Sequence, residues 1–346
     1  MRPSRLLVRA PNWLGDAVMA LPALGAIRAA FPAARMAIAA VDSVAPLFEE
    51  DTAASQDELI SLGGAEGSRR RQIKLLAQGK FDTALLLPNS FDAAWAARRA
   101  GIPERWGYAT NLRGWLLTRA VARPGARHLH QAEYYRALVR GLGLDAPESL
   151  PRLAVRPETA RRADALLVRS GVEGATPIVG FAPGAAYGHA KRWPPRRVAQ
   201  VIARAAKELG TVCVLVGAQA DRDAAREIES SLPADVRAVN LIGRTDLRLL
   251  AGVLARCRAF VSNDSGAMHL AAAIGIPVAA IFGPTDDRVT RPLGDHDVLV
   301  HQVFCRPCML RDCPIDHRCM KGISADAVVA SVTARLERRP VAAESP

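Results

Sequence analysis

The chain has 346 residues, of which 50% are hydrophobic and 23% are charged. At about 100–200 residues per domain this length predicts two domains, and the composition excludes collagen-like, disordered and small disulfide-stapled proteins. No run of about 18 apolar residues occurs, and Arg5, Arg9 and Asp16 interrupt the N-terminal segment, so we expect a cytoplasmic protein without a membrane span or signal peptide.

Short apolar strands alternate with amphipathic helices along the chain, which is typical of parallel α/β units. In the first half the pattern predicts, in chain order, a strand at 5–9, a helix at 16–30, strands at 36–41 and 83–87, and helices at 90–100 and 128–142. Pro147, Pro151 and Pro157 then interrupt the pattern, which indicates a linker between two domains.

A second series of alternating elements follows this linker. It predicts a strand at 178–182, a helix at 196–209, a strand at 211–216, helices at 221–232 and 246–256, a strand at 259–262, a helix at 265–274, a strand at 278–282 and a last helix at 324–338. We therefore predict two doubly wound domains with a ligand cleft between them, at residues 1–150 and 177–325. A linker with a connecting helix covers 151–176, and 339–346 form a flexible tail.

The net charge is +12, and the positive charge is concentrated in one stretch. Residues 67–140 contain 14 basic and four acidic residues, whereas residues 1–66 contain five basic and eight acidic ones. A local field of this kind attracts a polyanion, which is a nucleic acid, an anionic membrane surface or an acidic substrate. The alternative is that an arginine- and alanine-rich composition places arginine on ordinary solvated helix faces.

Three polar loops follow predicted strands, where doubly wound folds bind their ligands. In the first, at residues 11–16, Gly15 stands immediately before a carboxylate at the start of a helix. Glycine lets the backbone turn tightly there, and Asp16 would then be exposed as a general base that takes a proton from a hydroxyl nucleophile. The alternative is that Asp16 satisfies the N–H groups of the first helical turn.

The second loop, at residues 182–194, carries two glycines followed by Lys191 and Arg192. Flexible backbone and adjacent cations suit a phosphate-bearing ligand, although neither a Walker motif nor a dinucleotide-binding fingerprint is present. The alternative is a long surface loop with ordinary basic residues.

The third loop, at residues 262–269, clusters Asn, Asp and Ser at a helix start. Gly266 would let an anion approach the first N–H groups of that helix, and His269 lies on the same helical face as Ser265. The alternative is a well-capped helix with an incidental histidine. Residues 283–285 offer a further polar contact at the same sheet edge. Asp221 and Asp223 stand where a carboxylate could meet a ribose hydroxyl, but we favour their interpretation as first-turn helix acids.

The three loops overlap three sequence motifs, and a fourth motif stands between the first and second loops. In chain order the motifs are PNWLGDAVMALPAL at 11–24, LLPNSFDAAWAARRAGIPERWGY at 86–108, GFAPGAAYGHAKRWPP at 180–195 and NDSGAMHLAAAIGIPVAAIFGPT at 263–285. Together they resemble glycosyltransferase family 9, the ADP-heptose:lipopolysaccharide heptosyltransferases. The PNSF and AKRWP segments point to the branch of that family whose acceptor already carries one heptose. The resemblance spans residues 5–330 and implies a GT-B fold, in which two Rossmann-like domains face a central cleft.

The resemblance also implies roles for individual residues. Asp16 matches the catalytic base and Lys191 the cation on the donor phosphates, and the donor-binding loop is matched by Asp264, Ser265, Gly266 and His269. Transfer of L-glycero-D-manno-heptose from ADP-heptose would invert the anomeric carbon. An acceptor hydroxyl deprotonated by Asp16 attacks C1 while ADP leaves, and no metal ion or other cofactor is required.

The implied acceptor is heptosyl-Kdo2-lipid A, an acidic lipid-linked sugar at the inner face of the inner membrane. The acidic acceptor and the membrane surface would be partners for the basic stretch at 67–140. The resemblance thus predicts a cytoplasmic enzyme that binds the membrane peripherally. Asn89 and Ser90 would line the acceptor site or, alternatively, cap the helix that follows them.

Four of the six cysteines crowd into one segment at 304–322, with the spacing C-x2-C-x4-C-x5-C: Cys305, Cys308, Cys313 and Cys319. In a cytoplasmic protein, clustered thiols favour a structural zinc ion or an iron–sulfur cluster over disulfides. The spacing matches neither zinc ribbons nor ferredoxins closely, so free thiols or disulfides in a structured loop are the alternative.

Three other functions are compatible with parts of this sequence. A family 9 transferase could act on another acceptor, either as a heptosyltransferase I or on another core glycan. A nucleic-acid-binding protein could use the basic stretch and a metal-stapled cysteine loop, but the aromatic content is only 5% and we find no basic–aromatic recognition module, so we expect no nucleic-acid partner. A relic could bind the nucleotide without transferring sugar.

Overall fold

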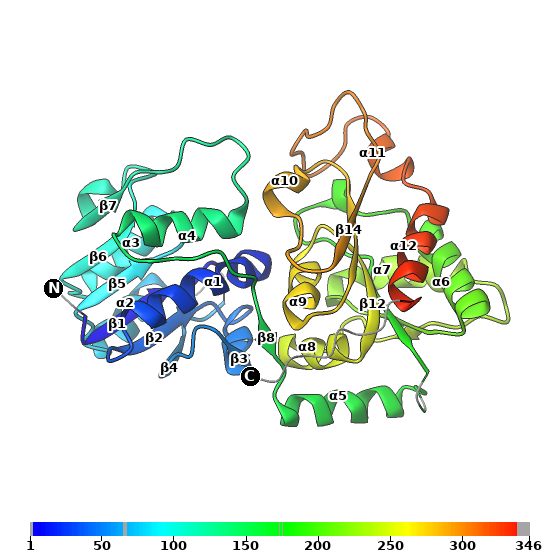
Figure 1. Ribbon diagram of the computed structural model, residues 1–346, viewed down its shortest axis with the longest axis horizontal. Helices are drawn as coiled ribbons and strands as arrows, with labels where there is room; N and C mark the ends of the chain where they lie inside the picture. The colour runs from blue at the N-terminus through cyan, green and yellow to red at the C-terminus, as the bar shows by residue number, and fades with distance from the viewer. Residues whose placement is uncertain (1–2, 65–67, 173, 175, 338–346) are drawn as a thin grey trace. The chain divides into compact units, whose positions relative to one another are not determined.

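The protein folds as two α/β units, Met1–Arg156 (unit 1) and Pro157–Pro346 (unit 2). The structure is a computed structural model that describes residues 3–64, 68–172, 174 and 176–337 (Figure 1). The predicted tail at 339–346 lies outside the described residues. In the described part of the chain, no helix is both long enough and apolar enough to span a bilayer.

Unit 1 is built on a parallel six-stranded sheet. Its strands are β1 (Arg5–Arg9), β2 (Arg35–Ala40), β4 (Glu58–Ser61), β5 (Thr83–Leu86), β6 (Glu104–Tyr108) and β7 (Arg119–Val121). Their order is β4-β2-β1-β5-β6-β7, so successive strands run outward from β1 in one direction and then from β5 in the other. In the register, Val8 lies beside both Ile38 and Leu85.

Helices cover both faces of this sheet. On one side α2 (Arg69–Gln78) and α3 (Phe91–Arg99) contact each other and share a hydrophobic cluster with Leu7 and Leu86. The helices α1 (Leu14–Ala30) and α4 (Gln131–Gly141) form a second packed pair. The short helices η1 (Ala45–Glu49) and η2 (Gly114–Leu116) lie in connections, and β3 (Asp51–Thr52) pairs antiparallel with β8 (Leu153–Ala154).

Unit 2 repeats the topology of unit 1. Its parallel strands are β9 (Ile178–Ala182), β10 (Val212–Leu215), β11 (Val239–Asn240), β12 (Cys257–Asn263), β13 (Val278–Phe282) and β14 (His296–Val300). Their order is β11-β10-β9-β12-β13-β14, which is the strand order of unit 1. This 3-2-1-4-5-6 order is that of the Rossmann fold, so the prediction of two doubly wound domains is confirmed.

The helices of unit 2 also divide between two groups. One hydrophobic cluster joins β9 and β10 to α6 (Pro195–Leu209), α7 (Arg222–Ser230) and α12 (Ala325–Glu337). In the other group α8 (Leu247–Ala255) contacts both α5 (Pro157–Arg169) and α9 (Gly266–Ile274). Four short helices complete the unit: η3 (His189–Lys191), η4 (Gln219–Asp221), α10 (Asp287–Thr290) and α11 (Arg318–Lys321).

The predicted strands and helices are present with ends that differ by a few residues, and several elements are new. The strand β6, with the sequence ERWGY, has charged residues that mask its strand character, and β11 has only two residues. The basic helix α2 buries only Leu76. The segment predicted as linker contains β8, which lies in unit 1, whereas α5 lies in unit 2 because it packs on α8.

The close approach of α5 and α8 depends on a glycine. A Cβ atom at Gly252 would stand 2.7 Å from Ala163 Cβ and 2.9 Å from the Thr159 carbonyl oxygen. We therefore expect Gly252→Ala to lower the free energy of unfolding by about 1–3 kcal/mol, as overpacking of a core does. Urea denaturation followed by circular dichroism measures this change.

Gly125→Ala is the matched control, because a Cβ atom there meets nothing within 4 Å. Equal stability of the two variants would contradict the close helix packing at residue 252.

Candidate active site

The predicted loops lie at the places where the strand order of each sheet reverses. In unit 1 these are the loops after β1 and β5, and in unit 2 the loops after β9 and β12. After these two parallel strands the chain continues toward opposite sides of the sheet, which leaves a crevice between the loops at their carboxyl ends. Doubly wound proteins bind ligands in this crevice. Each unit therefore has one such ligand-binding edge.

In unit 2, Asn263 joins the two loops of this edge. Its Nδ2 donates hydrogen bonds to the carbonyl oxygens of Pro183 (2.7 Å) and Gly184 (3.3 Å), and its Oδ1 accepts one from the Trp193 backbone N–H (3.2 Å). The asparagine is 2% exposed. One side chain thus holds both ends of the 183–193 loop against the end of β12.

Lys191 and Asp264, which the motifs placed in two different loops, form an ion pair at this edge. The Lys191 ammonium lies 2.5 Å from Asp264 Oδ2, and the Thr285 hydroxyl donates to the same oxygen at 2.7 Å. The side chains of the pair are only 11% and 6% exposed. A buried charge needs a partner, and Asp264 therefore fixes the ammonium at the mouth of the site.

The helix α9 begins immediately after this ion pair. Its N-cap residue Ser265 makes no side-chain capping bond, and its hydroxyl lies 3.0 Å from that of Ser262 instead. The N–H groups at the start of a helix, together with its dipole, favour an anion. His269 is buried within α9, one turn after Ser265.

The cysteine-rich segment packs directly against the 183–193 loop. The Ala190 N–H donates to the Arg311 carbonyl oxygen (2.9 Å) and the Tyr187 hydroxyl donates to the Met309 carbonyl oxygen (2.8 Å). A Cβ atom at Gly188 would collide with the backbone of Arg311. The Tyr187 ring also carries two cations, the Lys191 ammonium at 4.6 Å and the Arg311 guanidinium at 5.3 Å from its centroid.

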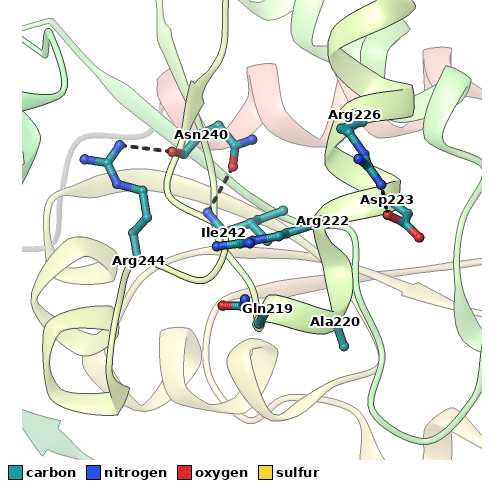
Figure 2. Close-up of a pocket in the computed structure, with 8 residues that line it drawn as sticks. All are labelled: Gln219, Ala220, Arg222, Asp223, Arg226, Asn240, Ile242 and Arg244. Carbon is teal, nitrogen blue, oxygen red and sulfur yellow. Dashed lines mark hydrogen bonds and ion pairs between the residues drawn. The ribbon is translucent and has the colours of Figure 1, made fainter.

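A cavity of about 560 Å³ opens at the same sheet edge, beyond β10 and β11 (Figure 2). Figure 2 shows the Arg222 side chain extending toward Ile242, and Arg244 reaching the Asn240 carbonyl oxygen, which lies 3.4 Å from its guanidinium. Its lining contains three arginines and one acidic residue: Gln219, Ala220, Arg222, Asp223, Arg226, Asn240, Ile242 and Arg244. The lining is therefore positively charged.

The two aspartates near this cavity have structural partners. Asp221 is buried, accepts a hydrogen bond from the Ala218 N–H (3.0 Å) and lies 3.5 Å from the Arg192 guanidinium. Asp223 is in the first turn of α7 and pairs with Arg226. Their interpretation as first-turn helix acids fits these contacts.

In unit 1, Asp16 lies in the first turn of α1, and Tyr135 of α4 donates a hydrogen bond to its Oδ1 at 3.1 Å. Burial, and to a lesser degree the Asp16 carboxylate, holds the pKa of Tyr135 well above its ordinary value. The phenol therefore stays protonated and keeps donating to the carboxylate. Nearby, the Arg9 guanidinium donates to Asn12 Oδ1 (2.6 Å) and braces the loop after β1.

Asn89 and Ser90 follow β5 at the same edge. The Ser90 hydroxyl accepts a hydrogen bond from the Ala93 N–H and caps α3, which is the alternative that the sequence left open. The Asn89 amide donates to the Tyr134 hydroxyl (2.8 Å) and accepts from the Arg113 guanidinium (3.4 Å). Contact of either residue with an acceptor stays a prediction.

All six cysteines are free thiols. In the described ranges, no group of three or more His, Cys, Asp and Glu side chains lies close enough to hold a metal ion. Cys313 nevertheless has a special environment, because backbone N–H groups of residues 315, 317 and 316 donate toward its sulfur and lower its pKa. The metal or iron–sulfur site remains a prediction.

Sequence reasoning missed Tyr135, Tyr187 and Arg311. Tyr135 is 119 positions from Asp16, and the Tyr187 and Met309 partners are 122 positions apart. Aromatic residues in a helix or loop ordinarily indicate core packing, so no local pattern marked them as neighbours of the site.

Two doubly wound Rossmann-like units with polar loops at their reversal points are the architecture of GT-B glycosyltransferases. The chain belongs to glycosyltransferase family 9 (heptosyltransferase), whose sequence profile matches residues 69–318. It is therefore an enzyme, as its motifs predicted.

Several characterised proteins are similar to it. The lipopolysaccharide heptosyltransferase 2 of Salmonella typhimurium is 33% identical over 298 residues, which cover 84% of this chain and 85% of that protein. The lipopolysaccharide heptosyltransferase 1 of Pseudomonas aeruginosa is 28% identical over 71% of this chain and 67% of its own length. The solved structure of E. coli ADP-heptose lps heptosyltransferase II superimposes with a TM-score of 0.81 at 29% identity, covering 96% of this chain and 98% of that one.

The environment of Cys313 predicts its reactivity. A lowered pKa raises the thiolate fraction at neutral pH, and the thiolate is the form that reacts with alkylating agents. We expect iodoacetamide to alkylate Cys313 faster than the other five cysteines. As the pH is lowered, the rate at Cys313 should begin to fall at a lower pH than the rate of an ordinary thiol. Peptide mass spectrometry over a time course measures each site.

Cys213 and Cys257 are internal controls, because burial raises the pKa of each to about 12. Joint protection of Cys305, Cys308, Cys313 and Cys319 that a chelator relieves would contradict free thiols and support a bound metal instead.

Proposed function

We propose that this enzyme transfers L-glycero-D-manno-heptose from ADP-heptose to the first heptose of heptosyl-Kdo2-lipid A, in the lipopolysaccharide inner core. The relative that is 33% identical is named a heptosyltransferase 2, whereas the relative named heptosyltransferase 1 is more distant and covers less of the chain. This difference favours the acceptor that already carries one heptose. A heptosyltransferase I acceptor, without that sugar, is the second candidate.

The donor diphosphate would bind at the edge of unit 2 where Lys191 meets the N-terminus of α9. The single observation that carries this step is the buried Lys191–Asp264 pair at 2.5 Å, which holds a cation beside the start of α9. Positive charge there stabilises the diphosphate as it leaves, so a bridging metal ion is unnecessary. Turnover is therefore expected to persist in EDTA.

The arginine-lined cavity beyond β10 and β11 would receive the nucleoside end of the donor. It lies at the same sheet edge as Lys191, and its size suits part of a nucleotide. Gln219 and Asn240 offer amide groups there for hydrogen bonds to a base or a ribose.

In unit 1, Asp16 would accept the proton of the attacking acceptor hydroxyl. The Tyr135 hydrogen bond to Oδ1 orients the carboxylate for this proton transfer. Inversion follows because the activated hydroxyl attacks the face of C1 opposite to the departing ADP. The acceptor is anchored in a bilayer, and we propose that the enzyme works on the inner face of the inner membrane as a peripheral protein.

The acceptor can be identified directly. We expect the purified enzyme, given ADP-heptose, to add one heptose to heptosyl-Kdo2-lipid A and none to Kdo2-lipid A, as measured by mass spectrometry of the lipid. Addition to Kdo2-lipid A would establish the second candidate. Absence of transfer to both, with ADP still bound, would contradict the transferase proposal and favour a nucleotide-binding relic.

Separate substitutions distinguish the base from the donor cation. We expect Asp16→Asn to lower kcat by about 10²–10⁴-fold, the usual contribution of a general base, with the Kd for ADP unchanged. Lys191→Gln is expected to weaken ADP binding by about 10–100-fold, because a hydrogen bond to a charged group contributes about 1.5–3 kcal/mol. Steady-state kinetics and calorimetry measure the two effects.

Two controls accompany these variants. Lys207→Gln removes a surface lysine that pairs with Asp235 and should leave ADP binding unchanged. Tyr135→Phe keeps the ring but not the donor, and should lower kcat and displace its pH profile without altering ADP binding. Full turnover by Asp16→Asn would show that another group is the base.

A further inference from the structure

Unit 1 exposes a cluster of aromatic side chains on α3 and η2. The Phe91 ring lies 6.2 Å from the Trp95 ring, nearly parallel to it, and 6.2 Å from the Trp115 ring. Trp115 is 61% exposed and Phe91 is 39% exposed. Contiguous exposed aromatic side chains are unusual on the surface of a water-soluble protein and mark a site of interaction.

The turn that carries Trp115 is held rigidly from beneath. Arg113 is fully buried and donates to the carbonyl oxygens of Tyr108 (2.9 Å) and Pro88. Leu112, which precedes Arg113, is 90% exposed and has a left-handed φ of 57°. Trp115, which follows Arg113, is also exposed. The buried arginine therefore anchors a turn that keeps two large apolar side chains mostly exposed to water.

Positive charge surrounds this cluster. The Arg98 guanidinium lies 5.1 Å above the Trp115 ring, and Arg99 is exposed beside it on α3. The neighbouring helix α2 presents Arg70 and Arg71 to solvent, while Arg69 pairs with Asp92 at 2.7 Å. These residues belong to the 67–140 stretch, in which basic residues outnumber acidic ones by 14 to four.

We propose that this surface, made by Phe91, Trp95, Arg98, Arg99, Leu112 and Trp115 and called the docking face below, binds the surface of an anionic phospholipid bilayer. Aromatic side chains, tryptophan above all, are favoured at the level of the lipid headgroups, because that region has an apolar side and a hydrated side. Arginines beside them attract anionic headgroups while their stems stay against apolar surface. Aromatic and cationic groups together thus match such a bilayer in both chemistry and charge.

The docking face adjoins the loop that follows β5. The Asn111 amide, in the turn that carries Leu112, donates to the backbone oxygen of Asn89 at 3.0 Å. This proposal rests on the proposed function and on the prediction from the sequence that Asn89 lines the acceptor site. Bilayer contact at the face would bring the acceptor sugar to that loop without extraction of its lipid from the membrane.

The first test uses vesicles and neither substrate. Vesicles of phosphatidylglycerol and phosphatidylethanolamine are expected to sediment the wild-type enzyme, and vesicles of phosphatidylcholine alone are not. Binding should weaken as salt is added, because ions screen the attraction between exposed charges. Vesicles with brominated acyl chains should quench tryptophan fluorescence, and loss of Trp115, the more exposed tryptophan of the face, should reduce that quenching.

Two double variants probe the face by different means. Leu112→Ser with Trp115→Ser removes apolar surface, and Arg98→Gln with Arg99→Gln removes charge; each is expected to weaken vesicle binding at least tenfold. Leu150→Ser and Arg237→Gln are the matched controls, since both side chains are exposed outside the face and should leave binding unchanged. All variants are expected to turn over a deacylated, water-soluble acceptor at the wild-type rate.

Failure of the wild-type enzyme to bind anionic vesicles, or wild-type binding by the Leu112/Trp115 variant, would overturn the proposal. Loss of turnover on the soluble acceptor with retained vesicle binding would assign the face to the acceptor site instead and would also overturn it. The proposed function fails separately: if no acceptor is glycosylated while vesicle binding still depends on the face, the docking proposal stands and the transferase proposal falls.

Discussion

The strand order of the two sheets is the constraint on which the rest of the structure depends. In each unit the first half of the strands is added on one side of the first strand and the second half on its other side. The loops after β1 and β5 are therefore neighbours, and so are the loops after β9 and β12. Polar residues placed there are held by rigid strands, and the helices that follow direct N–H groups toward the same edge. Asp16, Asn89, Lys191 and Asp264 owe their positions to this one feature.

The charged side chains at these edges, Lys191 and Asp16, are stabilised by contacts with neighbouring side chains. The Lys191 ammonium is buried against Asp264, which Thr285 also contacts, and the Asp16 carboxylate receives the Tyr135 hydroxyl. A buried ion without a partner is costly, so each functional group has a neighbour that holds it in one orientation. The contacts that stabilise the fold therefore also set the positions of these two charged groups.

The 304–322 segment, which the family motifs left without a role, supports the 183–193 loop. It receives hydrogen bonds from Ala190 and Tyr187 and fills the space that a side chain at residue 188 would need. Arg306 anchors its other side, donating to the Gly283 carbonyl oxygen (2.9 Å) and pairing with Asp287 (2.5 Å). Whether or not a metal joins its thiols, the segment forms one wall beside Lys191.

The sequence alone determined the two-domain α/β organisation, most strands and helices, and the loops that carry Asp16, Lys191 and Asp264, because hydrophobic periodicity and turn residues act over short distances in the chain. The family motifs added the expected roles of those residues. Only the tertiary structure decided which side chains surround them. Asn263 reaches Pro183 across 80 positions and Tyr135 reaches Asp16 across 119, and such partners follow from the packing of helices on sheets, which no local pattern encodes. The short strand β11 and the charged strand β6 escaped prediction for a related reason, since their neighbours in the sheet, and not their own composition, make them strands.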